Sequence, residues 1–209
     1  MLYLIGLAGI LWLMSPAHAR RQYWPLGAQV SLAMTTELLA WSGLVGTNSN
    51  HVLYNGYLAL EPCLMVLTAG RSEWFWKGKV TWLVLVLALS LVPWALDVFW
   101  RYGWFDLATD AVVAQGFIFA AVFTVLLVRM GLLTERVLAR VPEFWLYVSL
   151  VIYFGCLAPF FGLFHVMLTR DVDLASRLYA IVESLFVLRY AGTAFFFAMA
   201  RLAPNNSPE

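Results

Sequence analysis

Three carboxylates and one guanidinium lie inside long apolar stretches of this sequence. Glu37, Glu61 and Glu183 have mainly apolar neighbours, and Arg189 is the single cation near the centre of such a stretch. A charge at the centre of a membrane helix costs about 2.5–3.5 kcal/mol, so these groups should face one another, or water, inside a bundle. Glu61 or Glu37 is the expected counter-ion of Arg189. Glu183 fits less well, because a six-residue step turns about 120° around a helix.

The spacing of neighbouring polar residues predicts a shared polar wall. Tyr54, Tyr57 and Glu61 recur at i, i+3 and i+7, which places them on one helix face. Further along the chain, Tyr179, Glu183 and Tyr190 fall on one stripe. The pattern favours a pocket that opens outward, and the alternative is a buried hydrogen-bonded network that only fixes helix packing. The predicted ligand-binding residues are Glu37, Tyr54, Tyr57, Glu61, His165, Glu183 and Arg189.

The sequence lacks the residues that several kinds of cofactor or catalytic site require. A retinal protein needs a lysine in its last helix, but the two lysines, Lys77 and Lys79, lie in a connector. The histidines His18, His51 and His165 are not paired at i, i+4. A zinc site could still use His51, His165 and a carboxylate. No nucleophile elbow or phosphate-binding glycine loop occurs, so we expect no cofactor. A net charge of +1 provides no basic field for nucleic acid.

Composition indicates an integral membrane protein. The 209 residues are 63% hydrophobic and 12% charged, whereas a soluble domain is about half apolar and a quarter charged. Seven stretches are near the ~20 residues that a membrane helix needs. We therefore predict an all-α, seven-helix transmembrane domain at 1–203 with a polar tail at 204–209. The predicted spans are 2–19, 25–46, 53–70, 80–100, 108–129, 144–168 and 177–200.

Charge in the connectors predicts the orientation of the bundle. Nine Lys and Arg residues lie on the side of connectors one, three and five and the C-terminus, against three on the other side. The positive-inside rule then places the N-terminus outside and the C-terminus in the cytoplasm of a multi-pass inner-membrane protein. "SPAHA" before Arg20 resembles a signal-peptide cleavage site, but "MLYLIGL" has no basic n-region. A retained first helix is therefore favoured over a cleaved one.

Two further patterns concern helix packing. Gly155, Pro159 and Gly162 recur at i, i+4 and i+7, which predicts a groove for a neighbouring helix with a bend at Pro159, or a hinge. Asp97 and Arg101 stand four residues apart at a helix end, which predicts a surface ion pair of little energetic value.

Three segments carry a family resemblance: "NHVLYNGYLALEP", "PEFWLYVSLVIYFGCL" and "LYAIVESLFVLRYAGTAFF". Together they resemble a group of small seven-helix membrane proteins of Bacteroidetes-type bacteria. The resemblance implies a stand-alone membrane module that acts beside a signalling partner such as a histidine kinase, and it brings no catalytic residues. Where that group has Asn or His early in its last helix, this chain has Glu183.

These observations lead to three functional hypotheses. The first is a receptor-like or sensory module that binds a small or lipidic ligand from the outer side and uses the basic connector 129–143 to dock a partner. The second is a small proton-coupled transporter in which Glu37 or Glu61 titrates. The third is an intramembrane metal-dependent hydrolase that uses His165 and a carboxylate.

Overall fold

The computed structural model describes residues 2–42, 50–75, 80–135, 137–170 and 172–202, and side chains within 164–179 lie outside the described part. All regular structure in these ranges is helical, which confirms the all-α prediction. The main helices are α1 (Leu2–Leu13), α2 (Ala17–Gln22), α3 (Trp24–Trp41), α4 (Asn50–Arg71), α5 (Val80–Leu96), α6 (Thr109–Leu133), α7 (Pro142–Arg170) and α8 (Val172–Leu202). Short turns of π-helix at Asp97–Arg101 and 3-10 helix at Leu138–Arg140 flank α6.

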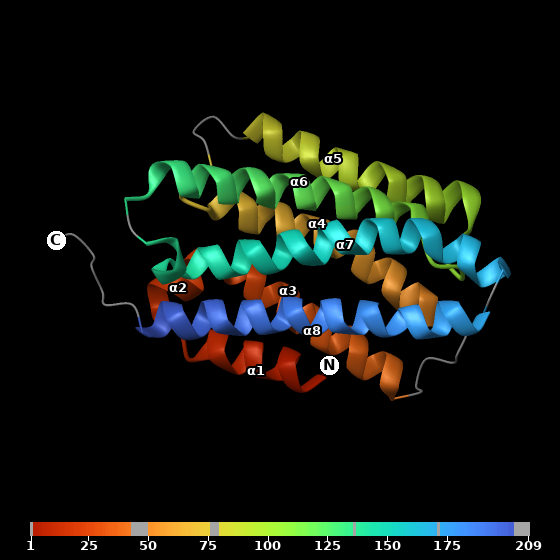
Figure 1. Cartoon of the computed structure of the whole chain (residues 1–209), viewed down its shortest axis with the longest axis horizontal. Helices are drawn as coiled ribbons and strands as arrows, with labels where there is room; N and C mark the ends of the chain where they lie inside the picture. Colours follow the sequence, from red (N-terminus) through yellow and green to blue (C-terminus); the bar gives the residue numbers. More distant parts are fainter. Residues whose placement is uncertain (1, 43–49, 76–79, 136, 171, 203–209) are drawn as a thin grey trace.

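The long helices run side by side and form a closed ring (Figure 1). Each packs on the next one along the chain, from α3 to α8, and α1 closes the ring by packing on both α3 and α8. Helix α4 also reaches across to α6. Because the connectors are short, successive helices are antiparallel, and the beginning of α4 lies at the same end of the bundle as the end of α7.

Within the described ranges, five helices are long and apolar enough to cross a membrane, which supports a multi-pass membrane protein. They are Asn50–Arg71, Val80–Arg101, Thr109–Leu133, Pro142–Leu163 and Ala180–Leu202. The seven predicted spans exceed this number for two physical reasons. The chain leaves the helix at Ser15 and Pro16, because proline lacks a donor and disfavours helix in the residue before it, so predicted span 2–19 divides into α1 and α2. Helix α3 carries several polar residues, Gln29 and Glu37 among them, which lower its apolar character.

Four aromatic side chains of α6 and α7 pack against one another. Phe123 stacks on Phe154 with ring centroids 6.3 Å apart and on Tyr147 at 5.9 Å, and Phe119 lies 5.2 Å from Phe154. All four side chains are buried. Together they form the core between α6 and α7.

The close approach of helices occurs at other glycines than the sequence indicated. A Cβ on Gly155 would lie 4.0 Å from Ala120, and one on Gly162 would meet nothing within 4 Å. A Cβ on Gly116 of α6 would instead lie 2.8 Å from the Ala158 Cβ and 3.1 Å from the Phe154 carbonyl oxygen. Helices α6 and α7 therefore approach closely at Gly116 of α6, which has no side chain, and not at Gly155 or Gly162 of α7. Helix α7 continues through Pro159 without a break.

Two buried polar side chains hold the connector between the π-helix and α6. Asn55 donates to the carbonyls of Trp104 (3.1 Å) and Asp106 (2.8 Å) and accepts from the Ala108 N–H at 3.1 Å. Asp97 accepts from the Ala111 N–H at 2.8 Å, in the first turn of α6. The predicted ion pair with Arg101 is present at 3.7 Å, but Asp97 is 1% exposed, so its carboxylate is buried and not at the surface. Its carboxylate caps a helix N-terminus, where N–H groups lack partners.

Candidate functional site: a polar cavity inside the helix ring

A cavity of about 580 Å³ lies inside the ring. It is formed by α3, α4, α6, α7 and α8, while α1 and α5 lie outside it. It occupies the half of the bundle that holds the beginning of α4 and the end of α7. Its lining residues are Ala33, Thr36, Glu37, His51, Tyr54, Tyr57, Leu58, Glu61, Leu107, Val112, Gln115, Tyr153, Phe154, Leu157, Phe161, Val182, Glu183, Phe186, Val187 and Tyr190.

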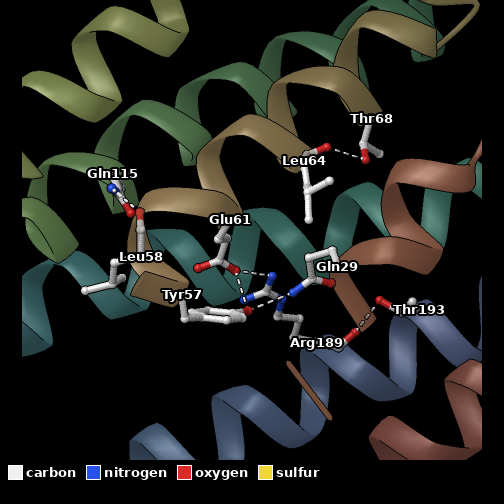
Figure 2. Close-up of polar contacts among 9 residues, drawn as sticks. All are labelled: Gln29, Tyr57, Leu58, Glu61, Leu64, Thr68, Gln115, Arg189 and Thr193. Atoms are coloured by element: carbon white, nitrogen blue, oxygen red, sulfur yellow. Dashed lines mark hydrogen bonds and ion pairs between the residues drawn. The ribbon is translucent and has the colours of Figure 1, made fainter. Parts of the chain in front are cut away.

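An ion pair between Glu61 and Arg189 lies at the deep end of this cavity (Figure 2). Glu61 is 4% exposed and Arg189 is 1% exposed. The Tyr57 hydroxyl donates to Glu61 Oε1 at 2.9 Å and accepts from Gln29 Nε2 at 2.8 Å. The network therefore joins α3, α4 and α8 through side chains that a membrane interior would not tolerate alone.

Aromatic rings surround the guanidinium of Arg189. Its Cζ lies 4.6 Å from the ring centroid of Tyr153 and 5.5 Å from those of Phe154 and Tyr190. Nη2 pairs with Glu61, whereas Nη1 makes no hydrogen bond within the described part of the chain. The negative faces of the rings provide its remaining stabilisation.

The other charged groups of the cavity have weaker contacts. The Tyr54 hydroxyl donates to Glu37 Oε1 at 3.4 Å, a long hydrogen bond. Glu183 is exposed, and it lines the cavity from α8. His51 Nδ1 lies 2.6 Å from the carbonyl oxygen of Phe105. A carbonyl only accepts, so Nδ1 carries the hydrogen in this contact.

The sequence-predicted residues meet in this cavity to a large extent. Glu37, Tyr54, Tyr57, Glu61 and Glu183 all line it, and Arg189 lies directly behind Glu61. Of the two counter-ions considered for Arg189, the structure selects Glu61. The side chains of His165 and Tyr179 lie outside the described residues. Among the described residues, no three His, Cys, Asp or Glu side chains gather as a metal site would require.

Two glutamines of the site were not anticipated. Gln29 positions Tyr57, and Gln115 lines the cavity while donating to the carbonyls of Leu58 (3.1 Å) and Ser90 (3.2 Å). Each is almost fully buried. The signal that would have found them is a lone amide in an otherwise apolar helix, which must reach a partner inside the bundle.

The opposite end of the bundle carries clustered arginines. Arg71 at the end of α4 donates to the Arg21 carbonyl at 2.9 Å and lies 5.5 Å from the Trp24 ring. Tyr23, at the beginning of α3, donates to Glu143 of α7 at 2.6 Å. The cavity and these cationic side chains thus lie at different ends of the molecule.

Comparison of this chain with protein-family models, with curated proteins and with solved structures gives no match.

Proposed function

We propose that this chain is a seven-helix inner-membrane protein that binds a small or lipidic ligand from the outer side and acts with a separate signalling partner. The observation that carries the proposal is the 580 Å³ cavity with an ion pair at its deep end. Small-molecule sites are typically clefts of about 300–1,000 Å³ with apolar walls and a few placed polar groups. Helices α1 and α3 complete the seven spans in this proposal.

The proposed orientation follows from the distribution of charge. The arginines Arg20, Arg21, Arg71, Arg140 and Arg201 lie at the bundle end away from the cavity. Positive charge favours the cytoplasmic side, so the cavity faces outward. The exposed apolar side chains of Leu133 and Val137, in the connector 129–143, offer a partner such as a histidine kinase an apolar contact on the cytoplasmic side.

The buried aromatic side chains between α6 and α7 favour ligand binding over transport. Phe154 lines the cavity, and the buried rings of Phe119, Phe123 and Tyr147 continue from it between α6 and α7. A molecule passing that way would have to separate them. Proton-coupled transport remains the second candidate, because Glu37 lines the cavity with no cationic side chain bonded to it among the described contacts. A metal-dependent hydrolase would need His165 to join His51 and a carboxylate.

Cysteine accessibility tests both the cavity and its orientation. Cys63 and Cys156 are first replaced by serine, and Thr36→Cys and Thr68→Cys are then compared in spheroplasts with a membrane-impermeant maleimide. Both threonines are nearly fully buried, but Thr36 lines the cavity, whereas Thr68 lies on α4 beyond its deep end. We expect the Thr36→Cys variant to be labelled and the Thr68→Cys variant to be protected.

Other labelling patterns would contradict the proposal. Labelling of the Thr36→Cys variant only in inverted vesicles would show that the cavity faces the cytoplasm. Protection in both preparations would show that no solvent-accessible cavity reaches Thr36. Uptake that disappears in Glu61→Gln would favour the transporter, and bound zinc in the purified protein would favour the hydrolase.

A further inference from the structure

The charged groups that line the cavity are predominantly acidic. Within the described side chains, the ionisable lining residues are Glu37, His51, Glu61 and Glu183, with no lysine or arginine. Arg189 lies behind the wall and compensates Glu61. His51 contacts the Phe105 carbonyl oxygen through Nδ1. Glu37 and Glu183 are left as two carboxylates that share one cavity.

The walls of the cavity are rich in aromatic rings. Four tyrosines and three phenylalanines line it, and Tyr153 belongs both to the cavity wall and to the surroundings of Arg189. An aromatic face attracts a cation electrostatically, and the attraction grows as water is excluded. Tyr153 already has a guanidinium 4.6 Å from its ring centroid. The wall therefore has the chemistry that receives a positive charge.

We propose that the ligand of this cavity is an organic cation, an amine or quaternary ammonium with an apolar body. This inference rests on the proposed ligand-binding function and specifies its ligand class. The cationic head pairs with Glu37, with Glu183 on the facing helix α8 adding attraction, and the apolar body lies against Phe154, Leu157 and Val112. An anionic ligand would face two carboxylates with no lining cation among the described side chains to offset them.

Three probes that differ only in their head group test the inference. They are 4-phenylbutylammonium, 4-phenylbutan-1-ol and 4-phenylbutanoate, each titrated into the purified full chain in a nonionic detergent. Binding to the folded state raises the unfolding temperature with ligand concentration, which gives a half-saturating concentration for each probe. We expect the ammonium probe to stabilise the protein at a concentration at least tenfold lower than the alcohol, and the carboxylate probe to give no stabilisation.

Matched variants locate the charge that matters. Glu37→Gln retains an oxygen for Tyr54 and should raise the half-saturating concentration of the ammonium probe about tenfold or more, because the charge-assisted hydrogen bond to the ammonium is lost. The half-saturating concentration of the alcohol probe should be the same for Glu37→Gln as for the unsubstituted protein. Glu73→Gln is the control, since Glu73 is exposed in the turn that follows α4, at the end of that helix away from the cavity. Glu183→Gln provides a second cavity variant.

Each contrary result has a distinct meaning. Equal affinity for the three head groups, or a Glu37→Gln effect no larger than that of Glu73→Gln, would overturn the cation inference while leaving a ligand cavity in place. Failure of the ammonium probe to bind would also overturn it. The proposed function fails separately if no probe stabilises the protein and the Thr36→Cys variant is protected from labelling on both sides of the membrane.

Discussion

Removing the guanidinium of Arg189 should destabilise the bundle severely, and removing Glu61 at the same time should restore much of the loss. In Arg189→Met the apolar stem of the side chain is retained, but Glu61 keeps a buried carboxylate whose remaining described partner is the Tyr57 hydroxyl. Breaking one side of a buried ion pair costs about 3–5 kcal/mol, since the other charge is left uncompensated. We expect the free energy of unfolding to fall by that amount.

In the double variant Arg189→Met/Glu61→Gln no charge is stranded. Glutamine still offers an oxygen to Tyr57. The stabilisation that is lost comes mainly from the contacts of the guanidinium with the surrounding rings, at about 1–2 kcal/mol. The double variant should therefore be about 2–3 kcal/mol more stable than Arg189→Met alone. Measuring Glu61→Gln alone as well completes a double-mutant cycle, which gives the coupling energy between the two side chains.

Reversible unfolding by SDS from mixed micelles measures these differences. Arg140→Met is the control, because Arg140 is exposed in the 3-10 turn and should cost less than about 1 kcal/mol. If the double variant is no more stable than Arg189→Met, the carboxylate of Glu61 is not what the guanidinium compensates. The interpretation of the cavity floor as an obligatory ion pair would then be wrong.

Three further substitutions test the packing. Asn55→Ala leaves three backbone groups of the connector without their partner and should cost about 2–4 kcal/mol in the same unfolding assay, with faster proteolysis between the π-helix and α6; unchanged proteolysis would contradict this. Gly116→Ala inserts a Cβ against α7 and should lower the free energy of unfolding by about 1–3 kcal/mol. A second substitution, Ala158→Gly, should recover part of this loss. In the control Gly56→Ala the added Cβ meets nothing within 4 Å, so this variant should be neutral or stabilising. Asp97→Ala removes the cap of α6 and should cost about 1 kcal/mol or more, while Asp97→Asn, which keeps an acceptor oxygen, should cost less; equal losses would indicate that charge, rather than capping, is what Asp97 contributes.

The core of the site was predictable from sequence because lipid excludes unpaired charges. That constraint predicts a buried carboxylate partner for Arg189, either Glu61 or Glu37, and the structure selects Glu61. Helix periodicity places Tyr54 and Tyr57 on the same face as Glu61. Neither inference needs the positions of neighbouring helices. The helical class follows equally directly from composition, since backbone groups in lipid must be satisfied within their own segment.

What was missed depends on contacts between segments far apart in the chain. The sequence spacing of Asp97 and Arg101 indicates only an ion pair at a helix end. The bond from the Ala111 N–H to the Asp97 carboxylate depends on how the first turn of α6 packs, which the spacing does not show. Gly155 and Gly162 look like an approach site, but the close approach requires a missing side chain on the opposing helix, which is Gly116. The length of an apolar stretch does not by itself determine the number of membrane spans. Pro16 interrupts one of the predicted stretches, and polar side chains lower the apolar character of α3.

The position of the Tyr57 hydroxyl has a consequence for how occupancy could be sensed. The tyrosine lines the cavity, yet its oxygen also holds Gln29 of α3 and Glu61 of α4, and through Glu61 the guanidinium on α8. A guest that competed for this one oxygen would change the relative energies of three helix positions in a single step. A partner at the far end of these helices could then respond to two alternative arrangements of α3, α4 and α8. The populations of these arrangements would depend on the hydrogen bonds of the Tyr57 hydroxyl.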